Sequence, residues 1–78
     1  MTTPVPPTAD SAGILGLDTS LRCSGYAVIR RSGVAWTVED LGEIRNPPGR
    51  SVAEALLHLH QAVAELLRRH APAAVAIE

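Results

Sequence analysis

Two acidic residues directly follow short apolar runs of the sequence: Asp18 follows Ile14–Leu17, and Glu78 follows Ala73–Ile77. If the two runs are neighbouring parallel strands, about 4.8 Å apart, both carboxylates lie at the edge of the sheet where α/β proteins bind ligands. Two carboxylates so close repel each other unless they share a cation. The pair therefore predicts a divalent-metal site. Taken alone, Asp18 could instead cap the following loop through backbone amides, and Glu78 could be solvated.

The elements that would carry these acids begin with short strands. Ile14–Leu17 is predicted as a strand buried on both faces, and Gly25–Arg30 as a second strand. A tight turn at Arg30–Gly33 would join it to a third strand at Val34–Val38, which Leu41–Arg45 extends after a kink. We expect these segments to form an antiparallel meander.

A helix and a fourth strand complete the pattern. Ser51 and Glu54 have the spacing of a capping box, and Pro72 ends the helix shortly after His70. The helix is predicted to bury a stripe of Val52, Leu56, Leu59, Val63, Leu66 and Leu67, with His58 on the opposite face. A helix returning across the sheet would make the Ala73–Ile77 strand parallel to the first. The predicted class is therefore α/β with a mixed sheet.

Length and composition set limits on the function. The 78 residues suffice for one small domain, and the Pro- and Thr-rich residues 1–13 are predicted to be a disordered tail. We expect a cytoplasmic protein, because there is no secretory signal pattern and no membrane-length apolar run. The single cysteine, Cys23, excludes an internal disulfide. The net charge of −1 gives no global signal for nucleic-acid binding.

The segments "ILGLDTSLRCSGYAVI" and "LGEIRNPPGRSVAEALLHLHQAVAELLRRHAPAAVAIE" resemble the RuvC family of Holliday-junction resolvases, over about Ile14–Glu78. The resemblance implies an RNase H-like fold and a crossover junction endodeoxyribonuclease, active in DNA recombination and repair. It further implies a homodimer that acts on four-way junction DNA with branch-migration motor proteins as partners.

The resemblance also assigns residues. The family holds two Mg²⁺ ions with four acids. Asp18 and Glu78 match two of these acids and are predicted to be catalytic and metal-binding, while the other two would lie further on, in a C-terminal helix. Residues 14–78 are therefore expected to form the N-terminal part of a nuclease domain that is incomplete at its C-terminus. Arg22 and Ser20 are predicted DNA contacts, and Arg22 could equally be a solvated loop residue.

One departure keeps two alternatives open. Thr19 and Ser20 stand where the family commonly has Pro-Gly. Two hydroxyls after a strand-end acid are similar to the phosphate loop of actin-like proteins, such as the accessory proteins of tRNA threonylcarbamoyl transfer. The other alternative is a catalytically inactive RNase H-like scaffold that only binds partners.

Overall fold

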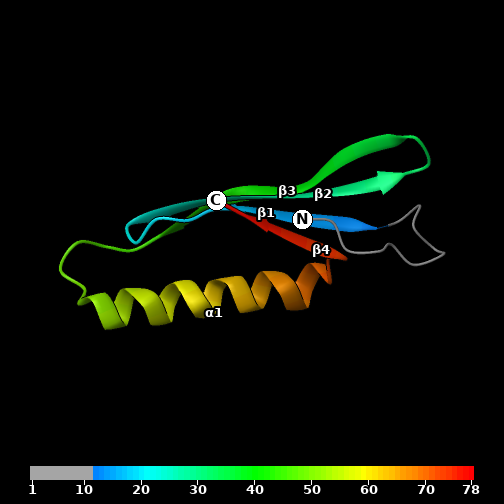
Figure 1. Cartoon of the computed structure of the whole chain (residues 1–78). Helices are drawn as coiled ribbons and strands as arrows, with labels where there is room; N and C mark the ends of the chain where they lie inside the picture. The colour runs from blue at the N-terminus through cyan, green and yellow to red at the C-terminus, as the bar shows by residue number, and fades with distance from the viewer. Residues whose placement is uncertain (1–11) are drawn as a thin grey trace.

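The computed structural model describes residues 12–78, which form one mixed sheet with a helix packed against one face (Figure 1). The elements are β1 (Gly13–Asp18), β2 (Cys23–Ser32), β3 (Ala35–Arg45), α1 (Val52–His70) and β4 (Ala74–Ile77). The sheet order is β3-β2-β1-β4; β2 is antiparallel to both β1 and β3, and β4 is parallel to β1. The predicted meander, crossover helix and parallel fourth strand are confirmed. Apart from its last two residues, the predicted tail lies outside the described residues.

The hairpin between β2 and β3 is longer than the sequence predicts. Its turn consists of Gly33 and Val34 alone, and the last pair is Ser32 with Ala35. Gly33 has a φ of +62°, which suits the first central position of a two-residue hairpin turn. The strands therefore continue two residues beyond the end of β1 at Gly13 (Figure 1).

The predicted kink in the third strand is a β-bulge within one continuous strand. Val28 of β2 pairs with Asp40 of β3, and the next residue, Ile29, pairs with Val38. Glu39 is thus the extra residue of the bulge. Successive side chains of a regular strand point to opposite faces, and a bulge re-aims one of them.

Helix α1 begins and ends with identifiable caps. The Ser51 side chain accepts a hydrogen bond from the Glu54 amide, and the Glu54 carboxylate accepts one from the Ser51 amide. This confirms the predicted capping box, and these hydrogen bonds hold the pKa of Glu54 below its usual value. The helix ends at His70 and is capped by Ala71, whose φ of +43° is left-handed, and Pro72 follows. No helix among residues 12–78 combines the length and apolar character that crossing a membrane requires.

The core lies between α1 and one face of the sheet. It consists of Leu15, Leu17, Val28, Ile44 and Leu66. Burial alternates along β1, because α1 covers only this face. The prediction that the first strand is buried on both faces is therefore wrong.

Exposed apolar residues lie on both β4 and α1. Within residues 12–78, β4 is an edge strand of the sheet, and Ile77 is 65% exposed. The helix buries Ala55 and Leu66, whereas Leu56 of the predicted stripe is 53% exposed. His58 is half-buried beside the sheet rather than on the opposite face.

Candidate functional site

The two acids singled out in the sequence lie side by side at one end of the sheet. Leu17 of β1 pairs with Ile77 of β4, so Asp18 and Glu78 occupy the next position on each strand. The ladder continues through them. The Glu78 amide donates to the Leu17 carbonyl at 2.9 Å, and the Thr19 amide donates to the Glu78 carbonyl at 3.1 Å. Backbone hydrogen bonds therefore fix the register of Glu78 relative to Asp18 along the two strands.

Both acids belong to the face of the sheet that α1 leaves uncovered. Side chains alternate along β1, so Asp18 points away from the helix, whereas Leu15 and Leu17 point toward it. Asp18 and Glu78 line a shallow pocket of about 340 Å³ whose other lining includes the small residues Gly16, Gly25, Ala27 and Ala76. The small residues leave open space beside the two carboxylates.

The loop after Asp18 is held from beneath by two buried polar residues. Ser24 accepts a hydrogen bond from the Ser20 amide at 3.0 Å and donates one to the Ser20 carbonyl at 2.8 Å. The Asn46 amide donates to the Arg22 carbonyl at 2.8 Å. The side chains of Ser20 and Arg22 are exposed, so both are accessible to a ligand at this edge.

The Thr19 hydroxyl has a structural partner. It donates to the Glu78 carbonyl at 3.1 Å, and so it ties the loop to the end of β4. A phosphate loop of the actin-like kind would use this hydroxyl on its ligand. The contact with Glu78 argues against that alternative and gives Thr19 a part in placing the second acid.

The donor set at this edge fits a magnesium ion. Carboxylate oxygens are hard ligands, and Mg²⁺ is usually held by one or two carboxylates together with water and substrate phosphates. Among residues 12–78, no cluster of three or more acids, histidines and cysteines could hold a metal on its own. Asp18 and Glu78 thus offer two of the ligands that such an ion needs.

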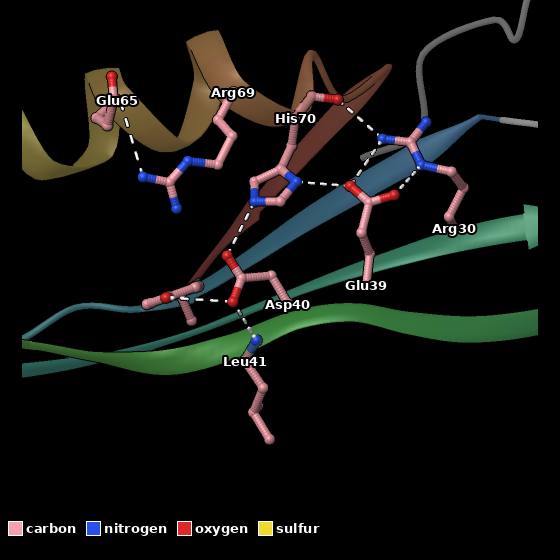
Figure 2. A network of polar contacts seen from close by, with 8 residues as sticks. Arg30, Glu39, Asp40, Leu41, Glu65, Arg69 and His70 are labelled. Carbon is pink, nitrogen blue, oxygen red and sulfur yellow. Dashed lines mark hydrogen bonds and ion pairs between the residues drawn. The ribbon is translucent and has the colours of Figure 1, made fainter.

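A second cluster of charged residues, which the sequence patterns did not reveal, lies on the helix side of the sheet (Figure 2). The ring of His70 lies between the carboxylates of Glu39 and Asp40. Hydrogen bonds to Glu39 and then Asp40 raise the pKa of His70. Hydrogen bonds from Arg30 and then His70 lower the pKa of Glu39 to about 2. No local sequence pattern links these acids to His70, which lies about thirty residues further along the chain.

Comparison with known proteins identifies the family. The family model described as "Crossover junction endodeoxyribonuclease RuvC" matches residues 14–78. The chain belongs to the RuvC family. It is 43% identical over 65 residues to the RuvC protein of Azorhizobium caulinodans and 45% identical over 65 residues to that of Hyphomonas neptunium, which in each case is 83% of this chain.

Solved structures support the fold. A structure described as "T. thermophilus RuvC in complex with Holliday junction substrate" matches with a TM-score of 0.77 at 24% identity, over 85% of this chain and 41% of that one. A second Thermus thermophilus RuvC structure matches with a TM-score of 0.75. The sheet is therefore of the RNase H-like type that the sequence predicted. The chain spans 38% and 39% of the length of the two curated relatives.

Proposed function

We propose that the full-length protein is a magnesium-dependent endonuclease that resolves four-way DNA junctions by hydrolysing phosphodiester bonds. The observation that carries the proposal is the pairing of Asp18 and Glu78 at one end of β1 and β4, on the uncovered face. Membership of the RuvC family supports the reaction, and the solved complex of a relative with a junction supports the substrate class.

In this mechanism Asp18 and Glu78 would hold the two Mg²⁺ ions expected at each site. When bound, these ions would supply positive charge that stabilises the attacking and leaving oxygens of the phosphodiester. Glu78 accepts a hydrogen bond from the attacking water and so orients it toward phosphorus. The exposed Arg22 and Ser20 contact phosphates that flank the bond to be cut. No covalent intermediate on the protein is needed.

The proposal extends to assembly and location. Two copies related by a two-fold axis would place two sites against the two-fold character of a junction. We further propose that branch-migration motor proteins are partners and that the protein acts in the cytoplasm. Residues 14–78 would then form the N-terminal part of the nuclease domain.

The test is cleavage of a synthetic four-way junction by the full-length protein and by its Asp18→Asn variant. We expect the variant to lose magnesium-dependent cleavage and to bind the junction as tightly or more tightly, because one repelling charge is removed. Glu65→Gln is the control, since Glu65 lies on α1 and pairs there with Arg68 and Arg69. The control should cleave normally. Normal cleavage by Asp18→Asn would refute the proposed site.

Substrate preference gives a separate test. Gel-shift titrations should show tighter binding of a four-way junction than of a duplex of equal length. Binding should weaken steeply with salt, because arginine–phosphate contacts release counterions. Equal affinity for both DNAs, together with no cleavage of either, would favour the inactive scaffold.

A further inference from the structure

The last residue of α1, His70, contacts two carboxylates of the sheet (Figure 2). The side chain of His70 is only 9% exposed. Its Nδ1 lies 2.5 Å from Glu39 Oε2, and its Nε2 lies 2.9 Å from Asp40 Oδ2. Because each nitrogen faces a carboxylate, both contacts are hydrogen bonds only when both nitrogens carry a proton. The geometry therefore favours the imidazolium form.

The bulge in β3 makes this arrangement possible. Adjacent residues of a regular strand point to opposite faces, so two consecutive acids could not both reach one ring. Glu39 is the extra residue of the bulge, and this re-aims its side chain to the helix side together with that of Asp40. The bulge thus supplies both partners of His70.

Arg30 on β2 joins the same cluster to the helix backbone. Its guanidinium donates to Glu39 Oε1 at 2.6 Å and to the His70 carbonyl at 2.8 Å. It lies across Gly13 of β1, where a Cβ would come within 2.9 Å of the guanidinium. Residues of β1, β2 and β3 therefore meet at the last residue of α1.

The chain enters β4 directly from this point. Ala71 and Pro72 follow His70, and the Ala73 amide then donates to the Gly13 carbonyl at 2.8 Å. β4 has four residues, one neighbouring strand in the described chain, and little burial along its length. Because β4 is so exposed, apolar packing contributes little to fixing its position. Its position depends instead on where the strand enters the sheet and on its hydrogen bonds with β1.

We propose that the network of Arg30, Glu39, Asp40 and His70 is a positioning device for Glu78. It fixes the point at which β4 enters the sheet and so holds the carboxylate at the far end of β4 beside Asp18. The four residues lie on the helix side of the sheet, whereas Asp18 and Glu78 line the pocket on the opposite face. The proposal rests on the proposed function for its catalytic consequence, whereas its structural consequence can be measured independently.

The network should depend on pH through groups that lie on three elements. His70 faces Glu39 and Asp40 of β3 and lies near Arg30 of β2, and the Tyr26 hydroxyl of β2 donates to Asp40. Arg69, on the helix itself, adds positive charge near Asp40. Hydrogen bonds to Glu39 and Asp40 raise the pKa of His70, so its imidazolium persists to higher pH than that of a free histidine, and the network loosens once the pH rises through the raised pKa.

The experiment compares hydrogen exchange in the full-length protein and its His70→Gln variant. We expect the amides of residues 74–78 to exchange at least tenfold faster in the variant, with the β1–β2 amides unchanged. The magnesium concentration for half-maximal cleavage should rise several-fold, while junction affinity without magnesium stays the same. His60→Gln is the matched control, because His60 is exposed on the same helix. It should behave like the unmodified protein.

A second variant separates positioning from general stability. Asp40→Asn keeps the Arg30–Glu39 pair and removes one charged partner of His70. It should reproduce the faster exchange of residues 74–78 to a smaller degree. Unchanged exchange in both variants, or a uniform increase across the whole sheet, would overturn the proposal. If Asp18→Asn cleaves normally, the proposed function fails, and the exchange data still decide whether the network positions β4.

Discussion

Replacing Asp18 by asparagine should stabilise the protein without magnesium and should remove its stabilisation by magnesium. The backbone of Glu78 is hydrogen-bonded to the end of β1, one strand spacing from Asp18, and both side chains are exposed. Two unit charges about 5 Å apart in water repel by roughly 0.8 kcal/mol, and salt near 0.15 M reduces this to about 0.4 kcal/mol. The free energy of unfolding in EDTA should rise by that amount, which corresponds to about 1–2 °C in Tm for a protein of about 150–250 residues.

Magnesium should reverse the order of stability of the unmodified protein and Asp18→Asn. At ten times its dissociation constant, an ion bound only by the folded state stabilises it by about 1.4 kcal/mol. The unmodified protein should gain this stability, and Asp18→Asn should gain little of it. Thermal unfolding of both full-length proteins, each in EDTA and in magnesium chloride, gives the four Tm values to compare.

The control for this comparison is Glu43→Gln. Glu43 is an exposed carboxylate of β3 that pairs with Arg45, so its loss should lower stability by less than about 1 kcal/mol. Its response to magnesium should equal that of the unmodified protein. The reasoning is refuted if Asp18→Asn is the less stable protein in EDTA, or if magnesium stabilises it as much as the unmodified protein.

Three further predictions concern the rest of the fold, each measured by urea unfolding of the full-length protein. A Cβ at Gly42 would lie 2.7 Å from the Tyr26 hydroxyl oxygen, so Gly42→Ala should cost about 1–3 kcal/mol as the ring and strand shift; a neutral result would show that the ring moves freely. Leu15→Ala should lower the free energy of unfolding by about 2–5 kcal/mol, because this side chain is fully buried. The side chain of Leu41 is 72% exposed, so Leu41→Ala should lower it by less than about 0.5 kcal/mol if the rest of the protein leaves this side chain uncovered. The pKa of Glu39 is about 2 in the folded state, so stability should fall as pH drops from about 4.5 toward 2; Glu39→Gln should flatten this dependence, and an unchanged profile would contradict the ion pair.

The parts of the fold that were predictable are those with local signals. The capping box depends on two residues three positions apart, Ser51 and Glu54, and the structure contains both of its hydrogen bonds. The parallel relation of β1 and β4 followed from counting chain reversals, and it placed Asp18 and Glu78 at the same end of the sheet. Their role in holding a metal stays a prediction.

The face of α1 was misjudged for a physical reason. A hydrophobic pattern weights leucine above alanine, and so the predicted stripe ran through Leu56. In the structure Ala55 is the buried residue on this turn, and the Asn46 side chain donates a hydrogen bond to its carbonyl. Leu56 is displaced to the exposed flank of the helix.

The network around His70 could not be predicted because its cause is a register shift. The sequence indicated a kink between Val38 and Leu41, but no local signal identifies which residue is extra. That choice decides whether Glu39 and Asp40 point to one face or to two. The partners of the histidine follow only when the bulge, the helix length and the strand order are all known.

The position of Glu78 follows from polar contacts more than from packing. β4 has one strand beside it in the described chain, and Ile77 is exposed. Its entry is fixed by the attachment of His70 to β3 and by the Ala73 hydrogen bond to β1. Its exit is fixed by the two hydrogen bonds from Thr19 to the Glu78 carbonyl. Directional bonds at both ends of a short strand hold a carboxylate more closely than non-directional apolar contact would, and a site built from two strands needs its acids in a fixed relation.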